Sequence, residues 1–196
     1  MTDTTGTTAY AQLDQRLAEL AGTWTLDPSH TSMELSVRHM MVATVRGRVR
    51  PESGTLHLAT DDPGRSSVEV EIDAASIDTG NPDRDAHLRS PDFLDVERYP
   101  TMRFRSTEVD DRGDGTFVLR GELTVKDVTK TVSLDCEVGG VVRDPYGNDR
   151  VGFSASGAID RTAFGLRWNA ALEGGGVVVG DKVSLALDAE FVKPAA

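Results

Sequence analysis

Hydrophobic and polar residues alternate along most of this chain. In the stretch 33-MELSVRHMMVATVRGRV-49, one set of alternate positions is largely apolar and the interleaved set is largely polar. Because successive side chains of a β-strand point to opposite faces, this period of two predicts strands with one buried and one solvent-facing side. The pattern recurs, with charged partner positions, at residues 56–58, 68–74, 102–104, 117–125, 132–138, 151–159 and 183–191.

Turn-forming sequences separate several of these segments. They are 61-DDPG-64, 110-DDRGDG-115 and 144-DPYGN-148, which combine the Asp, Asn, Pro and Gly residues of tight turns. Short turns between consecutive strands imply antiparallel neighbours. About eight to ten antiparallel strands, each with one apolar face, fit either a β-sandwich or a closed β-barrel. The all-β barrel is favoured because several segments reach about ten residues, and long tilted strands suit a barrel.

Small residues are mixed with large ones in the apolar series. A small inward side chain leaves space, so an eight-stranded barrel with such residues is expected to hold one elongated ligand. The small positions are Ala43, Gly47, Ala74, Gly121, Ala155 and Gly157.

The N-terminal segment departs from the strand pattern. Residues 1–22 combine a Thr-rich tail with leucines at helical spacing, and Gly22 is a natural helix end. This arrangement predicts a short amphipathic helix before a barrel domain over residues 23–193.

Two connections are too long to be turns. Residues 75–100 contain Asn81-Pro82, a helix cap followed by a favoured first-turn proline, which predicts a short helix to about Leu88. Residues 160–181 join the last two strands. Connections of this length are usually lids or binding loops.

Composition narrows the class of protein. The formal charge of -11 argues against a nucleic-acid partner and against adsorption to anionic membranes, although a local basic site stays compatible with it. The single cysteine, Cys136, excludes an intrachain disulfide and a thiolate zinc cluster, and it falls in the apolar series as a small core residue. No signal-peptide pattern and no apolar run long enough to span a membrane is present, so we expect a cytoplasmic protein without an integral membrane segment.

Motifs for catalysis or metal binding are weak. His30 and His87 lie in loop-like sequence, His57 is expected to face water, and no histidine pair has metal-ligand spacing. Neighbouring Asp27, Ser29 and His30 resemble a catalytic triad in type, but triads are assembled from distant parts of a chain. Two further segments, 152-GFSASG-157 and 173-EGGGVVVG-180, lack the context of a nucleophile elbow and of a phosphate loop. The carboxylate pairs Asp83/Asp85 and Asp61/Asp62 are expected in solvated turns, as caps.

The chain resembles the YceI-like family of lipid-binding proteins from about Trp24 to Val192. The resemblance is carried by 24-WTLDPSHTSMELSVRHM, 76-SIDTGNPDRDAHLRSPDFLDVERYPTMRFRS, 121-GELTVKDVTKTVSL, 143-RDPYGNDRVGFSASGAIDRTAFG and 178-VVGDKVSLALDAEFV. It implies an extended lipocalin-like antiparallel barrel of eight strands that holds a polyisoprenoid or similar long-chain amphiphile in its lumen. Many relatives carry a secretion signal, and some pair as dimers, so a homodimer is compatible with the resemblance. Leu35 stands where an aromatic residue is common in the family, a change that would widen the cavity slightly.

Candidate site residues follow from the strands and the long connections. His39 stands in the apolar series, and either it gives a ligand oxygen a hydrogen-bond partner in the lumen or it pairs with a neighbouring group near a barrel end. Arginines that flank the connections could meet an acidic head group if they converge, or could be exposed or paired: Arg84, Arg89, Arg161 and Arg167. The head-group candidates are His39, Arg89 and Arg161. The full set of ligand-binding candidates is Leu35, Val37, His39, Met41, Val45, Phe93, Phe104, Leu119, Phe153, Phe164, Trp168 and Leu185.

The predicted function is non-catalytic binding of a long-chain isoprenoid or fatty amphiphile, without cofactor or metal, for transport, storage or sequestration. Two alternatives stay open: a ligand-free barrel that serves in protein contacts or stress response, and an enzyme that acts on an isoprenoid or quinone. A lipid that co-purifies, its turnover, or an empty lumen would separate the three.

Overall fold

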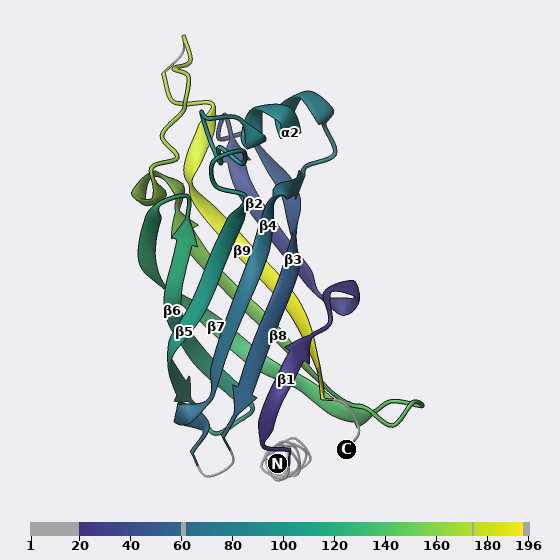
Figure 1. The fold of residues 1–196 in the computed structure, drawn as a ribbon. Helices are drawn as coiled ribbons and strands as arrows, with labels where there is room; N and C mark the ends of the chain where they lie inside the picture. Colours follow the sequence, from purple (N-terminus) through teal and green to yellow (C-terminus); the bar gives the residue numbers. More distant parts are fainter. Residues whose placement is uncertain (1–19, 60–61, 174, 194–196) are drawn as a thin grey trace.

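The computed structural model describes residues 20–59, 62–173 and 175–193. Apart from its last residues, the helix expected within residues 1–22 lies outside this part of the chain. The described residues form an elongated all-β barrel that carries one α-helix, α2, at one end (Figure 1). No helix among them combines the length and the hydropathy needed to cross a membrane.

Nine antiparallel strands make up the wall, and they include every strand segment that the alternation predicts. Their bounds are β1 Gly22–Leu26, β2 Ser32–His39, β3 Ala43–Leu58, β4 Ser67–Asp78, β5 Thr101–Asp111, β6 Thr116–Val125, β7 Val128–Arg143, β8 Asp149–Asp160 and β9 Val179–Lys193. Several strands run for 12 to 16 residues, and this length allows each to cross the barrel at a tilt.

The sheet closes on itself. Each strand pairs with its neighbours in the order β1-β3-β2-β9-β8-β7-β6-β5-β4, and β3 also pairs with β4. β1 and β2 both lie between β3 and β9, one after the other, with the short 3-10 helix η1 (Pro28–His30) between them. The nine strands therefore fill eight positions, and the expected closed eight-stranded barrel is confirmed.

The long alternating stretch 33–49 is a hairpin rather than one strand. A turn at residues 40–42 separates β2 from β3, and His39 pairs with Ala43 across it. Because directly paired residues share one face of a sheet, the odd-numbered positions keep the same face on both strands. The alternation therefore gives no sign of the turn. Its residues are apolar and include none of the Gly, Pro, Asn or Asp residues that are typical of turns.

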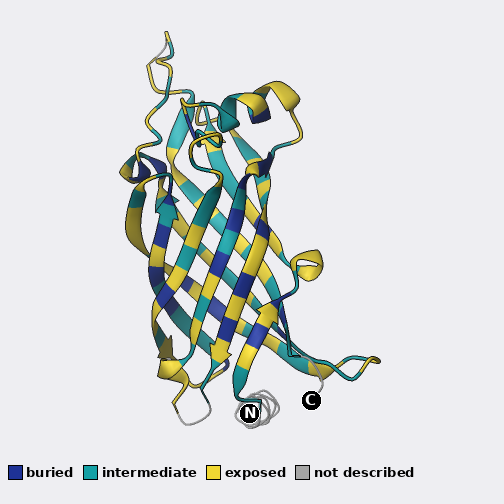
Figure 2. Cartoon of the chain, in the orientation of Figure 1, coloured by how far each residue is buried: buried dark blue, intermediate teal, exposed yellow. Residues whose placement is uncertain are grey.

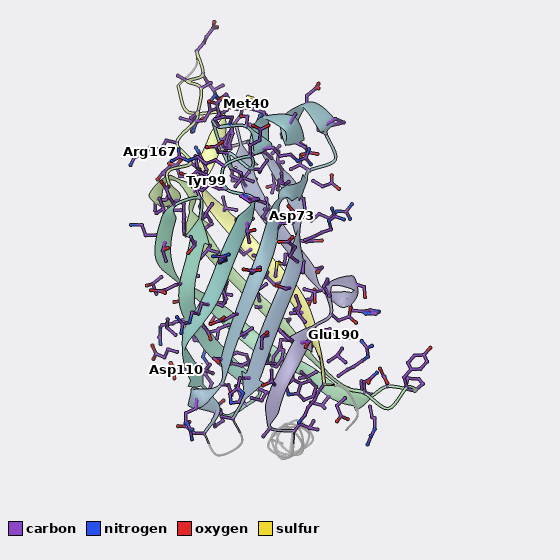
Figure 3. All side chains as sticks on the ribbon, viewed as in Figure 1. Met40, Asp73, Tyr99, Asp110, Arg167 and Glu190 are labelled. Atoms are coloured by element: carbon purple, nitrogen blue, oxygen red, sulfur yellow. The ribbon has the colours of Figure 1, made fainter. Side chains whose placement is uncertain are left out.

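The two ends of the barrel are built differently. The α2 end carries α2 (Pro82–Arg89), the 3-10 helix η3 (Arg161–Phe164) and the loop 165–178, and labelled Met40 lies there (Figure 3). The β1 end, where β1 begins and β9 ends, carries Asp110 and the short strand turns (Figures 1 and 3). Asn81 caps α2 by accepting from the amide of Arg84 at 3.0 Å, as the Asn-Pro pair predicts.

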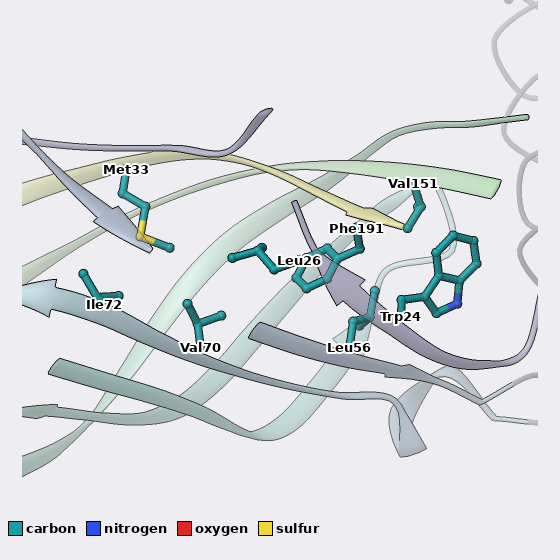
Figure 4. Close-up of a cluster of buried hydrophobic side chains, with 8 residues drawn as sticks. All are labelled: Trp24, Leu26, Met33, Leu56, Val70, Ile72, Val151 and Phe191. Carbon is teal, nitrogen blue, oxygen red and sulfur yellow. The ribbon is translucent and has the colours of Figure 1, made fainter. Parts of the chain in front are cut away.

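The largest hydrophobic cluster fills the barrel toward the β1 end. Trp24 and Val151 are fully buried there, with Leu26, Leu56 and Phe191 packed around them (Figure 4). The indole nitrogen of Trp24 donates to the carbonyl of Leu20 at 3.2 Å, so its polar atom is paired. Bands of buried and exposed residues alternate along the strands, as the sequence predicts (Figure 2).

Candidate functional site

A long cavity of about 850 Å³ runs through the barrel, and its walls are almost wholly aliphatic and aromatic. The inward positions of every strand from β2 to β9 contribute to it. Most of the predicted ligand-binding residues line this cavity: Leu35, Val37, His39, Val45, Phe93, Phe104, Leu119, Phe153, Trp168 and Leu185. On the strands, alternation identifies the inward-facing wall residues, because in a barrel one face of each strand points inward.

Two of the predicted residues lie elsewhere. Met41 sits in the hairpin turn and is 62% exposed, because the turn at residues 40–42 interrupts the strand that the alternation implied. Phe164 is 2% exposed but packs with Leu123 and Val125 in a cluster at the α2 end, outside the cavity lining.

The small inward residues do not account for most of the cavity. Of the six that were expected to leave space, Ala155 alone lines it. At Gly121 a Cβ atom would lie 2.5 Å from the ring of Phe104, and at Gly157 one would lie 2.8 Å from Leu134. These glycines let neighbouring large side chains lie against the wall, so the free volume comes from the barrel's width instead.

The basic side chains of the lining gather at the α2 end, whereas Ser66, Ser67 and Asp111 reach the cavity toward the β1 end. His39 reaches the cavity from β2, and its ring has no hydrogen-bond partner among the described residues. Asp83, Arg84 and His87 reach it from α2. The Arg84 guanidinium donates to the hydroxyl and the carbonyl of Thr79, at 2.7 and 2.9 Å, which leaves its remaining N–H groups available.

Three rings from the two long connections meet at this end. His87 contacts Phe93 and Trp168 edge-on, with ring centroids 5.1 and 4.6 Å apart, and Phe93 and Trp168 lie 5.4 Å apart. The Nε2 atom of His87 lies 3.0 Å from a carboxylate oxygen of Asp92, which fixes the orientation of the ring. All three rings line the cavity, so this cluster forms part of its cover.

Two of the head-group candidates are committed to backbone carbonyls. Arg161 is 3% exposed and donates to the carbonyls of Leu166, Trp168, Val179 and Gly180 and to the carboxylate of Asp181. These contacts use all five N–H groups of a guanidinium, so Arg161 holds the loop 165–178 to the barrel. Arg89 donates to Ala75 and Ile77 and lies outside the lining, as does Arg167.

The expectation that Asp83 and Asp85 are both solvated is wrong for Asp85. This carboxylate is 6% exposed and accepts from the amide and the hydroxyl of Thr79. Thr79 in turn accepts from Arg84, so Asp85 and Thr79 together position the guanidinium at the cavity. Nothing in the local sequence marks Thr79, because this role depends on where α2 folds back.

Asp27, Ser29 and His30 are close together but do not form a triad. The same ring nitrogen of His30, Nδ1, faces Asp27 at 2.9 Å and Ser29 at 3.3 Å, whereas a triad uses opposite nitrogens. Asp27 lies within reach of a shared cation with His30 and Glu190, but the guanidinium of Arg150 already bonds both carboxylates. This cluster is therefore an ion-pair network on the outside of the barrel.

Arg150 is the centre of that network. Its guanidinium contacts Asp27 and Asp144 at 2.9 Å each, and also Glu190. The hydrogen bond from Ser29, followed by those from His30 and Arg150, lowers the pKa of Asp27 against the opposing effect of burial. At Asp144 burial raises the pKa, but bonds from Arg150 and Asn148 outweigh it and hold the pKa low. The network ties the start of η1 and the β7–β8 turn to β8 and β9.

Cys136 faces the cavity as a buried free thiol, as the sequence predicts. Burial raises the pKa of its thiol to about 11. At neutral pH the group is therefore an uncharged part of the apolar wall. His57 is exposed, again as expected.

Comparison with known proteins identifies the family. The YceI-like domain matches residues 24–191. The chain is 37% identical to a UPF0312 protein of Serratia proteamaculans over 163 residues, 82% of this chain and 84% of that protein. It is 34% identical to a UPF0312 protein of Vibrio cholerae over 139 residues, 71% of this chain and 74% of that protein.

Solved structures share the fold. The Campylobacter jejuni YceI protein matches with a TM-score of 0.68 and 27% identity, covering 81% of this chain and 90% of that one. BcnA of Burkholderia cenocepacia matches with a TM-score of 0.71 and 20% identity, over 84% and 98% of the two chains. A polyisoprenoid binding domain from Saccharophagus degradans, implicated in plant cell wall breakdown, matches with a TM-score of 0.64 and 12% identity, over 87% and 98%. The barrel, its lumen and these matches together show that the chain belongs to the YceI-like family.

Proposed function

We propose that the protein binds one long-chain amphiphile, a polyisoprenoid or a similar lipid, inside the barrel and releases it chemically unchanged. The observation that carries this proposal is the continuous apolar cavity of about 850 Å³. A cavity of this size, lined by apolar residues with a few polar groups, is typical of a ligand site rather than of a packing defect. The polyisoprenoid binding domain from Saccharophagus degradans has the same fold, and this likeness supports the proposal of a ligand of the same class for this chain.

The size of the cavity sets the size of the ligand. A dry cavity of about 150 Å³ accommodates a benzene ring, which corresponds to roughly 25 Å³ per carbon atom. On that scale 850 Å³ accommodates on the order of thirty carbon atoms. A branched or unbranched chain of that length fits, whereas a small metabolite would leave most of the apolar wall without contacts.

The apolar tail supplies most of the affinity. Burial of about fifteen to twenty CH₂-sized groups contributes on the order of 12–16 kcal/mol before costs, at roughly 0.8 kcal/mol each. Ordering the chain and losing its free motion take back several kcal/mol, which leaves an affinity in the micromolar range or tighter. Because isoprenoid tails repeat one unit, the site should select by length and head group more than by identity.

The polar lining at the α2 end gives the ligand its orientation. His39, Arg84 and His87 lie together at that end, next to apolar walls that continue toward the β1 end. The basic side chains of the lining lie at the α2 end, where an acidic head group finds donors, whereas Ser66, Ser67 and Asp111 line the cavity toward the β1 end. We therefore place the head at the α2 end and the tail toward the cluster around Trp24, with Arg84 and His39 as head-group residues.

A matched pair of substitutions on one strand tests the proposal. Ala155 points into the lumen from β8, and Ala158 on the same strand is exposed. Ala155→Trp should fill the middle of the cavity and remove the lipid that native mass spectrometry and organic extraction find in the wild type. Ala158→Trp should retain it. An Ala155→Trp variant that carries as much lipid as the Ala158→Trp variant would rule out the lumen as the site.

The same extraction separates the alternatives. A lipid recovered in a chemically altered form after incubation with the protein would favour an enzyme that acts on an isoprenoid or quinone. A lumen that stays empty after expression, and after incubation with geranylgeraniol, would favour a barrel that serves in protein contacts.

A further inference from the structure

Large hydrophobic side chains are exposed at two places on the described part of the molecule. Met40, Met41 and Val42 form the tip of the β2–β3 hairpin, and they are 39%, 62% and 79% exposed. Val177 from the loop 165–178 is 39% exposed, and the amide of Met40 bonds the adjoining carbonyl of Val178 at 2.8 Å. We call these four residues the apolar tip. The second place is the β7–β8 hairpin, with Val142 and Tyr146.

The apolar tip is held in a costly backbone conformation. Met40 and Met41 have φ angles of 47° and 59°, a region that two-residue turns normally fill with Asn or Gly. The guanidinium of Arg38 bonds the carbonyl of Met41 and the hydroxyl of Thr44, and so fixes the turn from below. A contact outside the barrel would account for methionines at such positions with their side chains in solvent.

The tip is also continuous with the mouth of the lumen. Arg38 and His39, directly before it, line the cavity, as do Val178 and Val179, directly after Val177. A surface that covered the tip would therefore lie against the α2 end of the cavity. β1 begins and β9 ends at the opposite end of the barrel (Figure 1), so neither element would obstruct such a surface.

The hairpin beside the tip is locally basic. Arg38 and Arg46 are the charged residues within four positions of residues 40–42, whereas the chain as a whole carries -11. Of the carboxylates at this end, Asp78 and Asp181 are paired with Arg48 and Arg161, at 2.9 and 3.1 Å, and Asp83 lies on α2 next to Arg84. In the loop 165–178 the charges of Arg167 and Glu173 offset each other.

The attraction between the apolar tip and a charged surface depends mainly on the charges close to the tip. Salt screens charges beyond about 10 Å at ordinary ionic strength, so the acidic residues on the rest of the barrel act weakly on a surface at the tip. An apolar tip flanked by arginines combines the two features with which peripheral proteins bind anionic bilayers. The local charge thus weakens, for this end, the expectation from net charge that anionic membranes are avoided.

We propose that the apolar tip docks on the surface of an anionic lipid bilayer and seats the α2 end of the lumen against it. Met41 and Val42 enter the head-group region, and Arg46, which has no ion-pair partner among the described residues, meets lipid phosphates. A long-chain lipid would then pass between bilayer and lumen without exposing its tail to water. The docking goes beyond lumenal binding and does not require it, so it is testable whether or not the lumen is filled.

Vesicle flotation tests the docking. Wild-type protein should float with vesicles of phosphatidylcholine mixed with phosphatidylglycerol, and much less with pure phosphatidylcholine. The double variant Met41→Ser/Val42→Ser should lower the partition coefficient by about tenfold, because two apolar side chains no longer enter the interface. Arg46→Glu should lower it by at least about fivefold and weaken its dependence on salt.

The other exposed hairpin provides the matched control. Val142→Ser/Tyr146→Ser removes a comparable pair of exposed apolar residues at the β1 end and should leave flotation unchanged. Absence of wild-type flotation, or equal flotation of tip and control variants, would overturn the proposal. A wild-type dimer that the tip variant converts to monomer, without any vesicle binding, would also overturn it, in favour of a second copy of this chain as the occupant.

Discussion

The β1 end and the α2 end of this barrel are closed in different ways. At the β1 end the interior is filled by side chains of the strands: Trp24 and Val151 are fully buried, and Arg150 on β8 binds the carboxylates that follow β1 and β7 and one on β9. At the α2 end the cover comes from two long connections, through the rings of His87, Phe93 and Trp168 and through Arg161. From this difference we infer that the β1 end contributes more to stability and that a ligand enters at the α2 end, which loops cover.

The two tryptophans of the chain test this comparison most strongly. Trp24→Ala should lower the free energy of unfolding by about 3–5 kcal/mol, because it opens a large cavity in a packed cluster. Trp168→Ala removes ring contacts from a half-buried cover and should cost only about 0.5–1.5 kcal/mol. Urea unfolding of both variants measures the two values.

The rate of lipid release should show the reverse order of effects for the two tryptophan variants. A folded Trp168→Ala protein loses part of the cover and should release a bound long-chain lipid faster, whereas the Trp24 substitution acts through stability. Equal losses of stability at the two sites would contradict the division between a structural end and an access end.

Replacing Arg150 should have the next largest effect on stability. Replacement by Met keeps the length of the side chain but leaves Asp27, Asp144 and Glu190 without their shared cation, which should lower the melting temperature by several degrees. Arg105→Met is the control, since Arg105 forms an exposed pair with Glu69 at 3.1 Å that should contribute little.

The effect of Arg150 should depend on pH in one direction. The pKa values of Asp27 and Asp144 are lower in the folded protein than in the unfolded chain, where they are about 4. Groups of this kind contribute stability above about pH 4 and lose it as the pH falls through their folded pKa values. The difference in melting temperature between wild type and Arg150→Met should therefore be greatest at neutral pH and shrink in acid. A difference that grows in acid would show that the network is not what stabilises this region.

The sequence predicts the wall of the lumen far better than its ends. Alternation determines which side of each strand faces inward, so Leu35, Phe104 and Leu185 could be assigned before the fold was known. It could not reveal the turn at residues 40–42, because pairing His39 with Ala43 preserves the alternation. The partners of Arg161 and Asp85 were equally hidden, since they are backbone groups and a threonine brought close only by folding. Local sequence patterns determine which side of a strand faces inward, whereas contacts between residues distant in the sequence determine what covers the ends of the barrel.

The smallest expected effect is that of replacing His39. This substitution tests whether the ring contacts the ligand or is only part of the wall at the access end. Its ring lines the cavity and has no hydrogen-bond partner among the described residues, so a ligand oxygen would find it available. His39→Leu keeps the bulk and removes the hydrogen bond, and should weaken binding of geranylgeraniol by about threefold to tenfold. Binding of a hydrocarbon of similar length without the hydroxyl should stay unchanged. Isothermal titration with both probes measures the difference, and equal changes for the two would mean that the ring serves only as part of the wall.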